Sequence, residues 1–416
     1  MSIDTTVTII GAGQAGLAMS RCLTDHSVDH VVLERGRVAE SWRSQRWDSL
    51  RLLTPNWMSR LPSHRYTGPD PEGFMTMPEV TRYLSAYADS FAAPVQDETR
   101  VFRARRTDAG FVLDTNQGVV TSRFLVVATG AAAQPSIPDI ATAMPADVFQ
   151  IAPVHYKNPD QLPAGRVLVV GASASGVQLA EEIHASGRPV TVAVGAHTRM
   201  PRTYRGFDIQ LWLDLMGVLG RSYDSVSDIE AARRAPSLQL VGGRGGRDID
   251  LATLRAQGVE LAGRLTAVDG HRVRFSDDLR ATILAAADAN HRLLERMDRW
   301  ACETGLEPEI DPVSRPVPVY PGRPVRQARL GPSGFATVLW ATGYRPDHSW
   351  VDMDVFDRSG HIAHDGGIVT RAPGMYLLGL PFLRTRKSTF IDGVGPDATA
   401  LCQHLVAHLA RTPTAA

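Results

Sequence analysis

The sequence predicts an α/β protein with two Rossmann-like dinucleotide-binding units, the second inserted in the first and carrying a helical insertion of its own. A strand, a glycine turn and a helix start occur at residues 6–16 and again at residues 166–176. Each copy ends much later in an apolar strand followed by Ala-Thr-Gly, at residues 128–130 and 341–343. Self-similarity of this kind indicates that one supersecondary unit occurs twice.

Composition sets the outer limits. A chain of 416 residues is expected to form two or three domains at ~100–200 residues each. Its 44 basic and 44 acidic side chains balance, so charge gives no argument for binding nucleic acid or an anionic membrane. No apolar run approaches the ~18 residues of a membrane span, and the first glycine motif leaves no room for a signal peptide. We therefore expect a soluble, cytoplasmic protein.

Few residue patterns indicate that the protein's own side chains carry out catalysis or bind a metal. Cys22, Cys302 and Cys402 are far apart and form no CxxC pair, so neither dithiol redox chemistry nor a zinc site is indicated. The 13 histidines are scattered, and no metal-ligand spacing, catalytic triad or carboxylate pair is evident. We expect no metal site and few acid–base residues.

The first unit begins with a β-branched strand and the turn Gly11-Ala12-Gly13-Gln14-Ala15-Gly16. Gly11 permits the turn, Gly13 leaves room for a pyrophosphate, and Gly16 lets the helix approach the strand. The amides of the helix N-terminus would then face the phosphates. The next strand, 29–33, ends at Glu34, which lies 23 residues after Gly11 and close to the ~20 expected for a ribose-binding acid. Further candidates for this cofactor site are Arg35, Trp42, Arg43, Val101, Ala128, Thr129 and Gly130.

Local sequence patterns predict the secondary structure of the chain between the two glycine turns. Residues 41–61 are irregular and rich in Trp and Arg, a helix starts at Pro78, and short strands are expected at 99–101 and 110–113. A buried strand at 123–130 and a linker at 135–138 follow. In the second unit the candidates are Gly171, Ser173, Ser175 and Gly176 of the turn, and Thr342 and Gly343 after the last strand.

The second unit is 53 residues longer than the first, counted between its first glycine and its Ala-Thr-Gly. We assign the excess to a helical insertion at about 206–310, with helices at 207–217 and 276–305. A strand at 374–379 and a helix at 398–409, preceded by a glycine-rich start at 392–397, close the chain. The predicted domains are 1–154 with 346–416 for the first dinucleotide, and 155–345 for the second.

Two dinucleotide sites on one chain suggest a flavin and a nicotinamide, with the cofactors carrying the chemistry. In the second unit Gly195 takes the place of the ribose-binding acid, and His197, Arg199, Arg202 and Arg205 follow. Arginine suits a 2′-phosphate because its planar fork donates two hydrogen bonds. We predict NADPH, with Arg199 as the best single contact. The alternative is that these arginines form a solvated surface loop.

These motifs, with Tyr344 after the second Ala-Thr-Gly, resemble the flavin-containing, class B-type flavoprotein monooxygenases over nearly the whole chain. The resemblance implies FAD in the first unit, NADPH in the second, and a C4a-peroxyflavin formed from dioxygen. That species would oxygenate a small substrate containing nitrogen, sulfur or a carbonyl group. The alternative activity is an NAD(P)H-dependent flavin oxidoreductase or oxidase that oxygenates no substrate, and a non-enzymatic flavoprotein is a second alternative.

Two departures from the family pattern bear on the site. The linker fingerprint keeps Phe149 and His155, but Ile151 replaces its glycine and Pro159 its aromatic residue. At the flavin edge, a position that is polar in many relatives is Leu53 here. The catalytic residues are unknown, and the flavin-edge candidates are Trp47, Leu53 and Thr54. Whether the insertion shapes the substrate pocket or forms a homodimer contact is left open.

Overall fold

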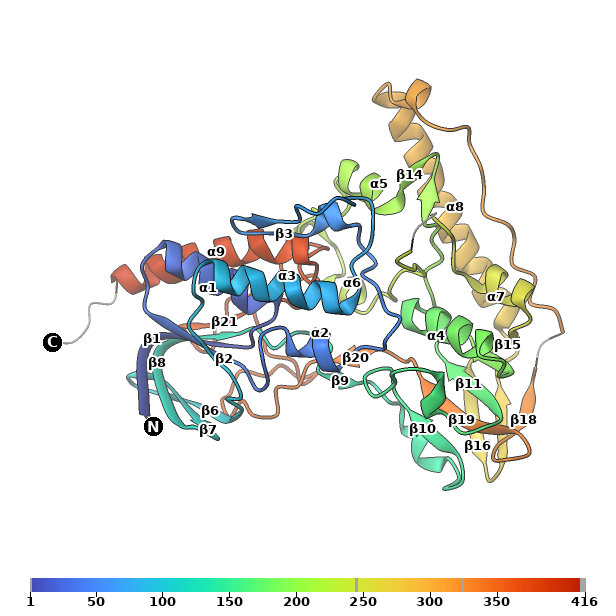
Figure 1. Ribbon diagram of the computed structural model, residues 1–416, viewed down its shortest axis with the longest axis horizontal. Coiled ribbons are helices and arrows are strands. Elements are labelled where there is room, and N and C mark those ends of the chain that lie inside the picture. The colour runs from blue at the N-terminus through green and yellow to red at the C-terminus, as the bar shows by residue number, and fades with distance from the viewer. Residues whose placement is uncertain (1, 244–245, 324, 412–416) are drawn as a thin grey trace.

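The computed structural model describes residues 2–243, 246–323 and 325–411, and two sheets form its two halves (Figure 1). The first sheet has seven strands in the order β5-β2-β1-β8-β7-β6, with β21 also paired to β8. Its strands are β1 (Ser2–Ile10), β2 (His30–Leu33), β5 (Val95–Gln96), β6 (Val101–Thr107), β7 (Gly110–Thr115), β8 (Gly118–Val127) and β21 (Met375–Leu377). β5, β2, β1, β8 and β21 run parallel, so their carboxyl ends share one edge.

The second sheet has five parallel strands in the order β10-β19-β11-β12-β15. They are β10 (Phe149–Ile151), β11 (Arg166–Val170), β12 (Val190–Ala193), β15 (Glu260–Ala262) and β19 (Phe335–Trp340). All five lie in sequence between β8 and β21 of the first sheet. The central strands β2, β11, β12 and β19 are largely buried apolar runs, as expected for parallel strands covered on both faces. The protein thus has a mixed α/β fold with Rossmann-like parallel sheets.

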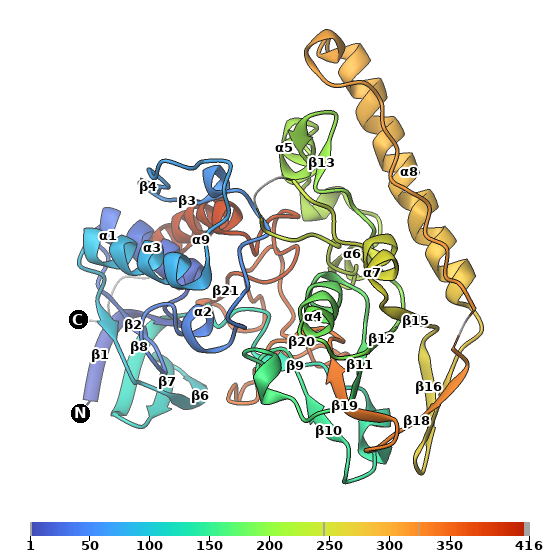
Figure 2. The ribbon, with the colours of Figure 1, turned by 45° about the vertical axis from the view of Figure 1, so that its right-hand side comes forward.

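Helices cover each sheet. Beside the first sheet lie α1 (Gln14–Asp25), α2 (Glu40–Ser44), α3 (Met77–Ser90) and α9 (Ile391–Arg411), and α1, α3 and α9 run side by side in both views (Figures 1 and 2). Beside the second lie α4 (Ala174–Ala185) and α7 (Leu251–Gln257). The start of α3 is fixed by a capping box between Thr76 and Glu79, with Pro78 in its first turn, because these side chains satisfy amides that have no partner within the helix.

The insertion holds α5 (Ile209–Leu215), α6 (Ile229–Arg233), the hairpin β13 (Thr203–Tyr204) and β14 (Phe207–Asp208), and the long α8 (Leu279–Glu303). α8 stands at the outer edge of the molecule (Figure 2). Its buried face includes Ile283, Leu294, Met297 and Ala301. A small sheet of β16 (Leu265–Asp269), β17 (Arg272–Phe275) and β18 (Gln327–Arg329) lies nearby. The shorter elements are β3 (Arg60–Leu61), β4 (His64–Arg65), β9 (Gln134–Pro135), β20 (Tyr344–Arg345), η1 (Asn56–Met58), η2 (Asp139–Ala143), η3 (Pro159–Gln161), η4 (Tyr223–Ser225) and η5 (Glu307–Glu309).

Three expectations need correction. The predicted insertion, whose residues 244–245 lie outside the described part, also contains β15, a strand of the second sheet. β10, placed before the predicted boundary at 154/155, pairs with β19 of the second sheet. The last helix begins at Ile391 rather than residue 398. Its glycines lie inside the helix, where they allow the preceding loop to pack closely. A Cβ at Gly393 would overlap the Lys387 carbonyl of that loop.

Candidate functional site

The first glycine turn has the geometry that its sequence predicts. Gly11 has φ +105°, and a Cβ there would lie 2.6 Å from the Ala128 carbonyl oxygen. A Cβ at Gly16 would overlap the Gly11 carbonyl oxygen. Gly13 differs, because a Cβ there would meet nothing within 4 Å and its φ of −82° suits any residue. Gly11 and Gly16 therefore serve the packing of strand and helix, whereas Gly13 keeps space open at the N-terminus of α1.

The second turn repeats this arrangement. Gly171 has φ +111°, and a Cβ on it would overlap the Ala341 carbonyl oxygen. A Cβ at Gly176 would likewise overlap the Gly171 carbonyl. Ser173, in the place of Gly13, is the N-cap residue of α4, and its hydroxyl makes no capping hydrogen bond. The second turn therefore repeats the packing of strand and helix, and it carries two hydroxyls, those of Ser173 and Ser175.

The residues after the last strand of each unit also correspond. Gly130 and Gly343 have φ of +78° and +96°, and a Cβ on either would meet nothing within 4 Å. The Thr342 hydroxyl donates a 2.6 Å hydrogen bond to the Ser136 carbonyl. The Thr129 hydroxyl is buried and has no hydrogen-bond partner among the residues that the structure describes. A buried polar atom without a partner is costly, so Thr129 marks a place where a polar ligand would fit the first unit.

Glu34 lies at the carboxyl end of β2, beside the first turn, and is 7% exposed. Its Oε2 accepts a 2.8 Å hydrogen bond from the Ala12 amide and its Oε1 a 3.0 Å bond from the Gly36 amide. Burial raises the pKa of Glu34, and these amides act in the opposite direction. The Thr99 amide donates to the Glu34 carbonyl at 2.7 Å, which brings the segment leading to Val101 to the same edge.

Gln14, which the sequence analysis did not select, links three segments at this edge. Trp42 Nε1 donates to Gln14 Oε1 at 3.0 Å, and Gln14 Nε2 donates to the Thr389 carbonyl at 3.3 Å. The Trp42 ring is partly buried, whereas Arg35 and Arg43 are exposed. The N-terminus of α1, the α2 segment and the loop before α9 therefore converge at the open space beside Gly13.

The flavin-edge candidates lie on the first-half loop between α2 and η1. Trp47 is a core residue, 5% exposed, and Leu53 and Thr54 are partly buried. Leu53 packs on an apolar cluster of the insertion, and its carbonyl accepts a 2.8 Å hydrogen bond from Arg202 Nη1. The insertion therefore contacts the loop that carries the candidates. Their roles at a flavin remain predictions.

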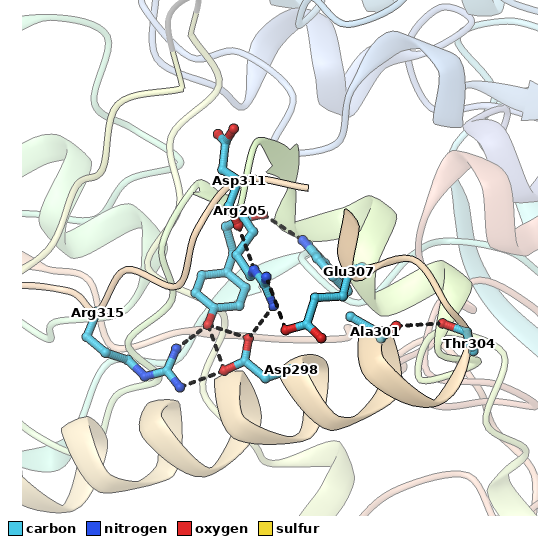
Figure 3. A network of polar contacts seen from close by, with 9 residues as sticks. Arg205, Asp298, Ala301, Thr304, Glu307, Asp311 and Arg315 are labelled. Carbon is cyan, nitrogen blue, oxygen red and sulfur yellow. Dashed lines mark hydrogen bonds and ion pairs between the residues drawn. The ribbon is translucent and has the colours of Figure 1, made fainter. Parts of the chain in front are cut away.

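The basic loop after β12 matches neither hypothesis for it, a 2′-phosphate contact or a solvated surface loop. Arg199 is 6% exposed, and its Nη2 pairs with Asp250 Oδ2 at 2.6 Å. Arg202 is buried against Asp208. Arg205 pairs with Asp298 at 3.2 Å in a network that also contains Arg315 and Glu307 (Figure 3). These arginines are neither a solvated loop nor free to bind phosphate, because acidic partners already hold them. The nearby His197 Nδ1 lies 3.0 Å from the Gly195 carbonyl.

A different arginine faces Gly195. The Nη2 of Arg264 lies 3.7 Å from the position of a Cβ on Gly195, and its Cζ lies 3.9 Å away. Arg264 follows β15, the strand paired with β12, and its side chain is exposed. Within the described part of the chain its guanidinium has no hydrogen-bond or ion-pair partner. Sequence reasoning missed it because β15 is only three residues long and has too few residues to show a period.

The linker fingerprint positions lie on β10 and in the turn that follows it. Phe149 is 39% exposed and His155 is exposed, whereas Ile151 is buried. The neighbouring Tyr156 contacts α4 of the second half, and Lys157 contacts the first half. The Tyr156 hydroxyl donates to Glu182 at 2.9 Å, and Lys157 Nζ donates to the Ser44 and Arg46 carbonyls at 2.6 and 2.8 Å.

Two searches of the described residues gave negative results. None of the helices in the described ranges has the length and apolar character needed to cross a membrane. In those same ranges, no three His, Cys, Asp or Glu side chains gather in a way that could hold a metal ion.

Comparison with known proteins places the chain. A family model for pyridine nucleotide-disulphide oxidoreductases matches residues 8–213. An uncharacterized CzcO-like oxidoreductase of Geobacillus kaustophilus is 30% identical over 97% of this chain and 98% of its own length. A flavin-containing monooxygenase from Stenotrophomonas maltophilia shares the fold over 98% of this chain and 99% of its own, with a TM-score of 0.67 and 18% identity. OTEMO in complex with FAD and NADP also shares it, with a TM-score of 0.56 and 17% identity over 99% of this chain and 85% of OTEMO. The chain therefore belongs to the dinucleotide-binding oxidoreductase family that includes the CzcO-like proteins, and it has the fold of the flavin-containing monooxygenases.

Proposed function

We propose that the protein is an NADPH-dependent FAD monooxygenase acting on a small substrate that contains nitrogen, sulfur or a carbonyl group. The supporting observation is a pair of equivalent glycine turns whose neighbouring strands end differently, in Glu34 and in Gly195 faced by Arg264. When bound, the flavin would accept a hydride from NADPH and react with dioxygen. The protein's own part is to hold both dinucleotides and to limit access of water.

FAD suits the first half. The buried Glu34 carboxylate at the end of β2 is placed to accept hydrogen bonds from a ribose. The space at Gly13 would admit a pyrophosphate, and the unpartnered Thr129 hydroxyl supplies a polar contact. FMN would use neither the ribose site nor the full pyrophosphate site.

NADPH suits the second half. Gly195 places no carboxylate where the 2′-phosphate of the adenosine ribose would lie, and Arg264 presents a guanidinium there. Such a cation near the end of this strand is the usual means of accepting a 2′-phosphate. Arg264 therefore replaces Arg199 as the proposed contact.

Oxygenation is favoured over thiol exchange by where the cysteines lie. Cys22 and Cys402 are buried in α1 and α9, and burial raises the pKa of Cys22 and raises that of Cys402 to about 12. Cys302 is exposed near the end of α8. A reactive thiol needs a lowered pKa, so neither buried cysteine suits dithiol exchange.

The test is turnover with amines, sulfides and ketones under ¹⁸O₂, measuring product mass, NADPH consumed and peroxide released. The proposal expects at least one product heavier by one ¹⁸O atom. If peroxide accounts for all the NADPH with every compound, the alternative applies, a flavin oxidoreductase or oxidase without substrate oxygenation.

A further inference from the structure

Arg46 is a partly buried cation without an acidic partner. It lies just after α2, in the first half, with its guanidinium 5.1 Å from the centre of the Trp42 ring. Its Nη1 donates a 2.8 Å hydrogen bond to the Gln45 carbonyl. Among the residues that the structure describes, no carboxylate forms an ion pair with it. Burial lowers the pKa of Arg46, and Tyr344 acts in the opposite direction.

Although it belongs to the first half, Arg46 acts electrostatically on the second site. Tyr344 directly follows the Ala-Thr-Gly of the second unit, and its hydroxyl interacts with Ser175 in the second glycine turn. Burial raises the pKa of Tyr344, and the Arg46 charge acts in the opposite direction. The Arg46 charge therefore interacts with a tyrosine whose hydroxyl is hydrogen-bonded to the first turn of α4.

Lys157, which follows β10, holds the main chain around Arg46 in place. Lys157 Nζ donates to the carbonyls of Ser44 and Arg46. The Asp48 amide donates to the Lys157 carbonyl at 2.9 Å, so the segment is tied to Lys157 on both sides of Arg46. A cation on such a segment is preorganised, and less side-chain entropy is lost when it binds a ligand.

The surroundings indicate an anion that also contacts the start of α4. The first amides of this 12-residue helix and the positive end of its dipole favour negative charge, and the Ser173 hydroxyl there makes no capping bond. Arginine and a helix N-terminus together match phosphate oxygens. An anionic substrate would satisfy Arg46 alone, whereas a pyrophosphate would satisfy both groups.

We propose that Arg46 binds the pyrophosphate of the nicotinamide dinucleotide from across the boundary between the two halves. The inference rests on the proposed function only in so far as the second unit holds this dinucleotide. Arg46 would act as a positioning residue, drawing the nicotinamide end toward the flavin half. Because NADP⁺ and NAD⁺ share the pyrophosphate, Arg46 should not distinguish them, in contrast to Arg264.

The experiment is calorimetric titration of the oxidised, FAD-loaded protein with NADP⁺ and with NAD⁺, using wild type, Arg46→Leu and Arg46→Lys. Loss of a charged hydrogen-bond donor should weaken both dinucleotides by the same factor, ~10- to 100-fold. Lysine should restore part of the affinity because it keeps the charge. Arg65→Leu removes an exposed arginine of β4 and should leave both affinities unchanged. FAD content should be equal in all four proteins.

Three results would overturn the assignment. Unchanged NADP⁺ and NAD⁺ affinities in Arg46→Leu, with or without a weaker substrate affinity, would remove Arg46 from the dinucleotide site. Loss of FAD would make it a flavin ligand instead. Wild-type protein that binds neither dinucleotide would reject the NADPH site itself. Since the titration needs no oxygenation, a protein that only releases peroxide still tests Arg46.

Discussion

The two glycine turns compare almost residue for residue, yet the strands next to them end in opposite ways. Gly11 and Gly171 both have positive φ and both pack on the alanine after the closing strand. At the end of the second strand, however, the first unit has a buried carboxylate at Glu34, and the second has Gly195 facing the Arg264 guanidinium. The turn is therefore a requirement of the fold, whereas under the proposed function the strand end selects which dinucleotide is bound.

The largest expected effect is a loss of flavin, and variants of the first glycine turn separate it from an effect on folding. Gly13→Val adds a side chain where no atom lies within 4 Å and the backbone is extended, so the protein should fold. The new side chain would occupy the pyrophosphate space, and nearly all flavin should be lost. Flavin absorbance per chain and circular dichroism measure the two effects.

Gly16→Val is the matched control, because its Cβ would overlap the Gly11 carbonyl. It should fail to fold or unfold at a much lower temperature. A folded Gly13→Val protein with full flavin occupancy would contradict the assignment of the first turn.

The next largest effect is expected from a variant that gives the end of β12 a carboxylate, like that of Glu34 at the end of β2. Gly195→Glu has room, since its Cβ would lie 3.7 Å from the nearest guanidinium atom. The carboxylate would neutralise Arg264 and repel a 2′-phosphate, so kcat/KM for NADPH should fall roughly 10- to 100-fold. The value for NADH should hold or rise. Equal loss with both cofactors would mean that this strand end does not read the 2′-phosphate.

Arg264→Ala should have a smaller effect, because its side chain is exposed and competes with water. We expect a loss of roughly tenfold in NADPH affinity, no change for NADH, and an unchanged Tm. Arg199→Ala is the contrasting variant. It leaves Asp250, 8% exposed, without its partner and should cost ~3–5 kcal/mol of stability. If Arg199→Ala alone changed the cofactor preference, the first choice of arginine would have been right.

The smallest effect concerns the first-half loop between α2 and η1. Leu53→Asn would add a hydrogen-bond donor at the predicted flavin edge, worth ~0.5–1.5 kcal/mol, or roughly two- to tenfold in rate. We expect oxygenation to be leaky in the wild type and the fraction of NADPH lost as peroxide to fall in the variant. A peroxide fraction that is unchanged in a variant with wild-type Tm would remove Leu53 from the flavin edge.

Local requirements made much of the fold predictable. The glycine spacing, the strand before each turn and the capped start at Pro78 follow from backbone geometry within a few residues. The fate of Arg199 does not, because its partner Asp250 is 51 residues away. The start of α9 was misread because Gly393 and Gly395 resemble a loop, although they serve the packing of a loop and a side chain against the helix.

The missed site residues share one property. Arg46 and Arg264 each follow a short element and are distinguished only by what lies across from them in space, Tyr344 and Gly195 respectively. Their sequence context resembles that of any exposed arginine. Sequence therefore indicated both proposed dinucleotide sites from their turns but could not indicate the cations that we propose for the second one.

Anaerobic reduction of the purified protein, monitored by flavin absorbance, tests the cofactor choice of both units in one measurement. The account predicts one FAD per chain, reduced by NADPH at a half-saturating concentration at least ~10-fold below that for NADH, in line with one charged contact to the 2′-phosphate. A protein that carries FMN or no flavin, or that is half-saturated at the same concentration of either nicotinamide, would contradict the claim that the two strand ends select FAD and NADPH.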